Sequence, residues 1–168
     1  MKQAIAGVAP PEVREVTIMT VWPTLAAGGL GRFLGRLYSI RIGIGWLTLG
    51  KLIALLSIPL ALPIFFWMLL PGVGRRYRLT NRRIILEQSK VFRPLWRPLT
   101  FVDLDRFDSI EVVVRPGQAW YPAGDLIFRN GAIETFRLEG VSRPETFRQT
   151  CLKARMGYVG VHNAMRGA

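Results

Sequence analysis

Cysteine and histidine are almost absent from this chain of 168 residues. Cys151 is the only cysteine and His162 is the only histidine. One cysteine excludes an intrachain disulfide and a cysteine-based metal cage, and a lone histidine without a neighbouring cysteine is a poor metal ligand. We expect Cys151 to be a small core residue on the apolar stripe of a helix and His162 to lie in an exposed tail.

Motifs that support catalysis or cofactor binding are also missing. Gly28, Gly29 and Gly31 lack the Lys-Ser/Thr pair and the preceding strand of a phosphate-binding loop. The aspartates closest to a cation-binding pattern are Asp103, Asp105 and Asp108. They lack the glycine and the final glutamate of an EF-hand, so we interpret them as turn and cap carboxylates. The sequence therefore predicts a protein that is not an enzyme and binds no metal and no other cofactor.

Acidic residues are few, and the chain is strongly basic. It has 23 Lys and Arg against 11 Asp and Glu, a formal net charge of +12. Residues 1–71 have six basic and two acidic residues, and residues 72–168 have seventeen and nine. A basic chain suits anionic lipid or nucleic acid. We expect lipid rather than nucleic acid, because the basic residues gather beside a long apolar stretch.

That stretch is Leu52 to Leu70, nineteen residues without a formal charge. At about 1.5 Å per residue a helix of this length covers roughly the 30 Å of a bilayer core. We predict a membrane segment over residues 45–71. Pro59 and Pro63 would kink a spanning helix, so a hairpin that enters and leaves on the same face is an alternative, and a buried core helix is another.

The chain before this stretch is less regular. Residues 1–24 are predicted to be an N-terminal tail without a signal peptide, in which Val16 to Trp22 is either a short strand or an interfacial segment. Residues 25–44 form an amphipathic lead-in with interleaved arginines, which lies among lipid headgroups or packs on protein. Basic residues flank the apolar stretch on both sides. Their excess on the C-terminal side predicts a cytoplasmic C-terminal domain by the positive-inside rule.

Residues 75–157 change to short β-type runs followed by one helix, and residues 158–168 are predicted to be a tail. Asn130-Gly131 separates two such runs and favours a type I′ hairpin turn. Ser142 to Glu145 has the pattern of a capping box, and Gly157 is the expected helix end. The fold class predicted for the whole chain is a membrane-anchored α+β protein, with a small β-barrel or orthogonal sandwich closed by a C-terminal helix.

One motif relates this domain to a known family. Tyr77-Arg-Leu-Thr-Asn-Arg-Arg-Ile84 directly follows the apolar stretch, and Leu104-Asp-Arg-Phe-Asp-Ser-Ile-Glu-Val112, a late hairpin and a closing helix come after it. In these features the chain resembles the bacterial pleckstrin-homology-like (PH-like) domains that flank membrane helices. The resemblance implies a PH-like fold and a membrane-proximal binding module without catalytic residues. The chain departs from the family in having one apolar span instead of a pair, and Ser89-Lys90 where a glycine turn is usual.

The candidate contacts for a lipid headgroup or an acidic partner are basic residues that follow the apolar stretch. They are Arg75, Arg76, Arg78, Arg82, Arg83, Lys90, Arg93 and Arg97. The predicted function is a non-enzymatic, membrane-anchored PH-like module at the cytoplasmic membrane surface that contacts anionic lipid or a protein partner. For the arginines, the alternative is that they only set topology. For the protein, the alternative is a small structural or accessory subunit of a larger membrane complex, with its helix packed on other helices.

Overall fold

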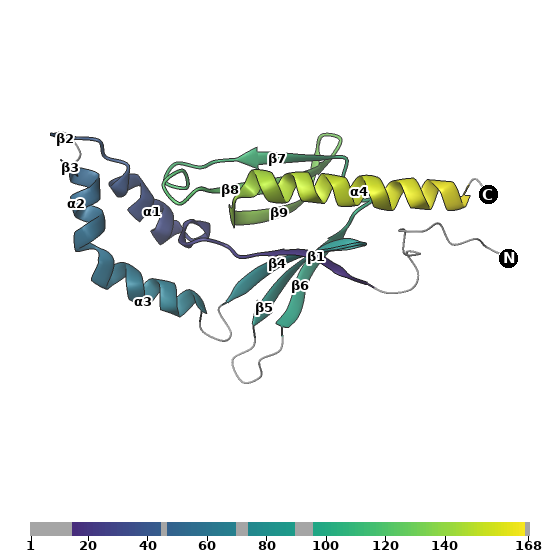
Figure 1. Cartoon of the computed structure of the whole chain (residues 1–168), viewed down its shortest axis with the longest axis horizontal. Coiled ribbons are helices and arrows are strands. Elements are labelled where there is room, and N and C mark those ends of the chain that lie inside the picture. The colour runs from purple at the N-terminus through teal and green to yellow at the C-terminus, as the bar shows by residue number, and fades with distance from the viewer. Residues whose placement is uncertain (1–14, 45–46, 70–73, 90–95, 167–168) are drawn as a thin grey trace.

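The computed structural model describes residues 15–44, 47–69, 74–89 and 96–166 as an α+β fold with two antiparallel sheets and a C-terminal helix (Figure 1). The first sheet, sheet A, has the strand order β1-β4-β5-β6, formed by Thr17–Val21, Arg75–Thr80, Arg83–Ser89 and Trp96–Asp103. The second, sheet B, has the order β7-β8-β9, formed by Ser109–Val113, Ala123–Asn130 and Ile133–Ser142. Helix α4 comprises Pro144–Arg166.

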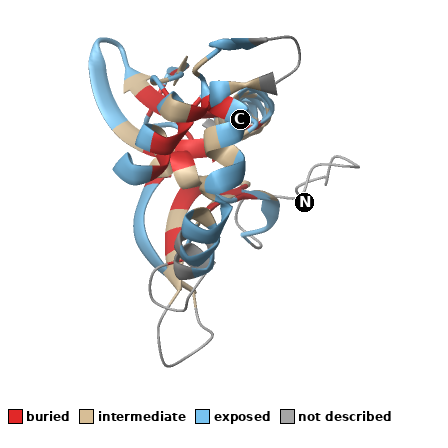
Figure 2. Cartoon of the chain, turned by 90° about the vertical axis from the view of Figure 1, so that its left-hand side faces the viewer, coloured by how far each residue is buried: buried red, intermediate tan, exposed pale blue. Residues whose placement is uncertain are grey.

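The core lies between the two sheets and beneath α4. Side chains alternate along β4, so Tyr77 and Leu79 point into the core while Arg76 and Arg78 point outward. From α4, Phe147 and Cys151 enter the same core and are fully buried. The buried residues of both sheets form one contiguous cluster, visible as the red band in Figure 2.

The two sheets do not close into a barrel, so the barrel predicted from the strand pattern is wrong. On one side they are joined by an isolated bridge between Pro23 and Val141 and by two hydrogen bonds, from the Thr24 N–H to the Gly140 carbonyl and from the Tyr77 hydroxyl to the Glu139 carbonyl, both at 2.8 Å. Proline has no N–H to extend such a ladder. Helix α4 packs on β7 and β8 and covers the core with apolar side chains.

A run of helices connects β1 to β4, and its later helices extend away from the sheets (Figure 1). We call residues 25–69 the helical limb. Its elements are a 3₁₀ turn at Leu25–Ala27, α1 at Gly29–Tyr38, β2 at Gly43–Ile44, β3 at Leu47–Thr48, α2 at Leu49–Leu56 and α3 at Ile58–Leu69.

The predicted membrane-spanning helix is not present in the described residues. The apolar stretch is divided at Ser57, whose hydroxyl donates to the Ala54 carbonyl at 2.9 Å where α2 ends, and Pro59 follows in the first turn of α3. None of the described helices has both the length and the apolar character needed to cross a bilayer. The prediction of a transmembrane anchor over residues 45–71 is therefore wrong.

The pairing of β1 with β4, which are distant in sequence, explains why the chain between them cannot cross a membrane once. Val21 of β1 pairs with Tyr77 of β4, and Thr17 pairs with Thr80, on either side of the whole limb. The chain leaves sheet A and returns to the same sheet, so an odd number of membrane crossings between β1 and β4 is impossible. β1 also shows that the segment from Val16 to Trp22 is mainly strand.

Two local predictions need refinement. Asn130 pairs with Ile133, so the hairpin turn is Gly131-Ala132, and only Gly131 has a positive φ, of 61°. Glycine at the first central position is typical of a type II′ turn rather than type I′. Helix α4 begins at Pro144 with Arg143, not Ser142, before it, and it continues past Gly157 to Arg166.

Burial of Cys151 provides a reporter of α4 docking, because burial raises the pKa of its thiol and hides the only cysteine of the chain. We expect thiol labelling at pH 8 to be slow in the native protein and fast in denaturant. Phe147→Ala should lower the free energy of unfolding by about 3–5 kcal/mol. It should therefore speed the labelling, because the thiol is exposed more often in a less stable protein. Thr146→Ala is the matched control on the exposed side of the same helix turn. Equal labelling rates for the two variants would contradict this placement of α4.

Candidate functional site

The predicted arginine cluster lies on sheet A, where it is divided between two faces. Arg76 and Arg78 project from the outer face of β4, and the carboxylate of Glu87 on β5 lies between them. The ion-pair distances are 2.5 Å to Arg76 and 2.7 Å to Arg78, and Glu87 is only 2% exposed. The single carboxylate therefore binds both guanidinium groups and offsets one of their two positive charges.

Aromatic rings cover the same outer face. The guanidinium of Arg76 lies 4.2 Å from the ring centroid of Trp96, which also packs edge-to-face with Trp22. Arg83 pairs with Glu15 at 3.1 Å and lies over Phe101 at 5.1 Å. Three of the predicted contact residues thus have structural partners, and the outer face is a network of ion pairs and cation–π contacts.

The opposite face of sheet A presents a different row. Arg75 on β4 is directly opposite Gln88 on β5, and Gln88 is directly opposite Arg97 on β6. Residues paired across neighbouring strands project from the same face of a sheet, so these side chains share one face. Arg75 and Arg97 are both exposed, and neither forms an ion pair with a described residue.

The remaining predicted contacts add little to either row. Arg82 is half-buried in the turn between β4 and β5, where its backbone N–H donates to the Thr80 hydroxyl at 3.3 Å. Lys90 and Arg93 lie outside the described residues. The structure therefore brings together two different groups of arginines, one paired with Glu87 and one without a described acidic partner.

The helical limb exposes an extensive apolar surface that the arginine prediction did not include. Leu55 and Leu56 at the end of α2 are 66% and 70% exposed, and Leu60 and Phe66 of α3 are about as open. Figure 2 shows exposed residues along these helices, in contrast to the buried band of the sheets. An apolar surface of this kind on a folded chain marks a site of contact with lipid or protein.

Close backbone contact attaches the limb to sheet B. Gly35 of α1 lies against Gly117 in the loop between β7 and β8, and a Cβ at Gly35 would overlap the Gly117 carbonyl oxygen. Gly117 has a φ of 92°, which favours glycine. Glycine at both positions allows the helix and the loop to approach at backbone distance.

An aromatic cluster beside this contact extends the attachment. The ring of Tyr38 is tilted by 58° against that of Trp120 in the same loop, with the ring centroids 4.8 Å apart. The Tyr38 hydroxyl lies 2.5 Å from the Ser57 hydroxyl at the junction of α2 and α3. Burial raises the pKa of the neighbouring Tyr121 to about 12, so its hydroxyl is neutral at physiological pH. Trp120-Tyr121 is thus mainly a brace for the limb, although Trp120 remains 45% exposed.

A buried carboxylate holds the base of the limb to both sheet B and the loop. Asp125 on β8 is fully buried and accepts hydrogen bonds from the Gln118 amide at 2.6 Å and the Gly140 N–H at 2.9 Å. It also pairs with Arg115 at 2.8 Å. Gln118 in turn donates to the Ala26 carbonyl at 3.5 Å. Every one of these contacts is internal, which indicates a structural role.

The other groups that chemistry might use have similarly ordinary surroundings. His162 stacks on Tyr158 at 6.1 Å on α4, so it is helical rather than in a loose tail. Asp108 accepts from the Gly131 N–H at 2.9 Å, a bond that lowers its pKa. The described residues contain no group of three or more His, Cys, Asp or Glu that could hold a metal.

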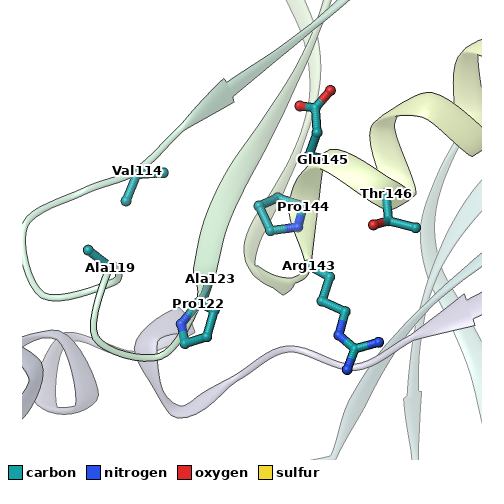
Figure 3. Close-up of a pocket in the computed structure, with 8 residues that line it drawn as sticks. All are labelled: Val114, Ala119, Pro122, Ala123, Arg143, Pro144, Glu145 and Thr146. Carbon is teal, nitrogen blue, oxygen red and sulfur yellow. The ribbon is translucent and has the colours of Figure 1, made fainter.

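A pocket of about 350 Å³ opens between the β7–β8 loop and the start of α4 (Figure 3). Its walls are mostly apolar, with Val114, Pro122 and Pro144 among them. At its rim Glu145 is exposed and already paired with Arg148 at 2.6 Å. The pocket therefore offers little polar recognition, and we assign no ligand to it.

Comparison with known proteins adds no identification. No protein-family model matches the chain, and neither a curated protein nor a solved structure matches it.

Replacing the buried Glu87 tests the outer network. Glu87→Gln leaves Arg76 and Arg78 without a balancing charge, and we expect a loss of about 1–3 kcal/mol in the free energy of unfolding, measured with urea. Glu111→Gln is the matched control, since Glu111 pairs with Arg129 on the exposed surface and should change stability by less than about 1 kcal/mol. Equal effects at the two sites would show that the Glu87 network is not structural.

The glycine contact at the base of the limb yields a second test. Gly35→Ala should separate α1 from the loop at Gly117, lower the free energy of unfolding and change the fluorescence of Trp120. Gly29→Ala in the same helix is the control, because a Cβ there meets no atom within 4 Å. Alanine at 29 should be neutral or stabilising by up to about 1 kcal/mol, whereas a neutral Gly35→Ala would contradict the close packing.

Proposed function

We propose that the protein is a non-enzymatic, PH-like binding module that lies on the surface of an anionic bilayer, with its helical limb in the headgroup region. The exposed apolar surface of α2 and α3 is the observation that carries this proposal. The limb is proposed to contact the bilayer surface without crossing it, because its helices are short and bent at Ser57.

Charge distribution supports lipid as the partner of this surface. From Val16 to Leu86 the chain has no aspartate and no glutamate, and it has nine lysines and arginines. The limb lies within this segment, and Arg36, Arg41 and Lys51 are exposed on it. Apolar side chains bordered only by cations suit an interface with anionic headgroups, each cation near the surface contributing about 1 kcal/mol.

The apolar contribution is of a similar order. Transfer of a half-exposed leucine into the acyl boundary contributes about 1 kcal/mol or more. Several such residues on α2 and α3 supply enough for reversible binding without a spanning helix. Trp120, at the base of the limb, adds the kind of amphipathic ring that favours a membrane interface.

The family resemblance supports the same proposal from another direction. It implies a membrane-proximal binding module, and two antiparallel sheets followed by a helix are compatible with it. Anionic lipids are concentrated in the cytoplasmic leaflet, so we propose that surface as the location. An accessory role, with the limb packed on the helices of a membrane complex, is the competing proposal.

Flotation with vesicles tests the proposal on the full chain. Leu55→Glu/Leu56→Glu places two charges on side chains that contact little of the protein, and we expect it to weaken binding to phosphatidylglycerol-containing vesicles by at least about tenfold. Ile133→Glu is the control for a carboxylate added to an exposed apolar position outside the limb: Ile133 is 72% exposed in the hairpin of β8 and β9, and the variant should leave binding unchanged.

Neutral vesicles complete the experiment. Because the limb carries exposed cations, we expect weaker binding to vesicles of phosphatidylcholine alone. We also expect binding to anionic vesicles to be lost as the salt concentration is raised. Equal flotation of the Leu55/Leu56 variant and the wild type would overturn the proposal. Absence of vesicle binding together with stoichiometric copurification of a membrane complex would replace it with the accessory role.

A further inference from the structure

Arg75, Gln88 and Arg97 form a row on the face of sheet A that also bears Tyr77 and Leu79, and we call it the inner row. The strand pairing fixes the separation of its two arginines. Arg75, Gln88 and Arg97 are in direct register on three consecutive strands. Neighbouring strands lie about 4.8 Å apart, so the backbones of Arg75 and Arg97 are about 10 Å apart, with their side chains on the same face. Two long side chains across this distance can meet around one small anion.

The neighbouring row shows that this arrangement is not a general property of the sheet. Arg76 and Glu87 are the neighbours of Arg75 and Gln88 along their strands. They lie on the opposite face of the sheet, where they form an ion pair. The inner row has no acidic residue at the equivalent position, which Gln88 occupies. Burial raises the pKa of the Tyr77 hydroxyl, and the charges of Arg75 and Glu139 act on that pKa in opposite directions. Within the described part of the chain, Arg75 and Glu139 nevertheless form no ion pair with each other. Two arginines thus face one another without a described counter-charge.

We infer that Arg75 and Arg97 form a binding site for a single phosphate group. A guanidinium presents planar, paired N–H donors that match phosphate oxygens, and two of them on opposite sides complete a clamp that lysine does not reproduce. The phosphate is that of a lipid headgroup or of a small phosphorylated compound, since both present the same oxygens.

The position of the row favours a headgroup as the source. β4 begins with Arg75 shortly after α3 ends at Leu69, so the row lies at the root of the limb (Figure 1). This choice of source rests on the proposed function, whereas the phosphate site itself does not. A limb lying in the headgroup region would bring the row level with lipid phosphates.

The first experimental arm uses inorganic phosphate without vesicles. Binding is followed by NMR of the arginine Nε–H signals of the full chain in phosphate-free buffer. We expect a saturable shift of two signals in the wild type and binding at least about tenfold weaker in Arg75→Gln/Arg97→Gln. Arg106→Gln/Lys153→Gln is the matched control: it removes the same charge at two exposed positions away from the row and should bind like the wild type.

The second arm compares vesicles containing phosphatidic acid with vesicles containing phosphatidylglycerol at equal surface charge. Phosphatidic acid presents a terminal phosphate, and we expect the wild type and the control to prefer it by at least about fivefold. The Arg75/Arg97 variant should lose the preference and retain binding through the limb. The Leu55/Leu56 variant should lose vesicle binding and keep the response to inorganic phosphate.

These outcomes separate the two proposals. Equal losses in the Arg75/Arg97 variant and in the charge-matched control would overturn the phosphate site and leave general charge attraction. Vesicle binding without a phosphate response or a headgroup preference would also overturn it, while the bilayer proposal would stand. A phosphate response without vesicle binding would support the site and assign it to a soluble phosphorylated compound.

Discussion

Pairing of β1 with β4 is the constraint on which the rest of this structure depends. The two strands are adjacent in sheet A, yet the whole helical limb lies between them in the sequence. The limb must therefore begin and end at the same sheet, as a long excursion rather than a tether. Its apolar residues cannot pass through a bilayer once and continue into a domain on the other side.

Register decides which arginines are available for binding. Residues that alternate along β4 face opposite sides of sheet A, so Arg75 and Arg76 enter different surroundings although they are adjacent in sequence. On the outer face Glu87 forms ion pairs with both Arg76 and Arg78. The basic residues of sheet A therefore lie in two chemical environments. On the outer face the arginines have acidic partners, whereas Arg75 and Arg97 of the inner row have none among the described residues.

The sequence anticipates features that depend on local chemistry. Alternation of apolar residues, the position of the late hairpin and the burial of Cys151 all follow from neighbours close in sequence. The failures depend on distant partners. The length of the apolar stretch suited a membrane-spanning helix. Only the pairing of Val21 with Tyr77 shows that the chain must return to sheet A after it. The extra turns of α4 after Gly157 were missed because glycine is a common but not an obligatory helix end.

The candidate site follows the same division. Residue types and net charge were enough to name eight basic residues as candidates, Arg75 and Arg97 among them, but not to distinguish these two from Arg76. That separation requires the cross-strand register, which one residue of slippage would reverse. The apolar surface of the limb was visible in the sequence as a hydrophobic run, while its exposure depends on the break at Ser57.

The attachment of the limb gives these two surfaces a fixed relation. Backbone contact between Gly35 and Gly117 holds α1 to sheet B, and Tyr38 links the same contact to Ser57 at the bend between α2 and α3. Beyond the other end of the limb in the chain, β4 begins at Arg75, the first residue of the inner arginine row. If the apolar residues of the limb contact a bilayer as proposed, this attachment also sets the height and orientation at which Arg75 and Arg97 would meet the phosphate layer.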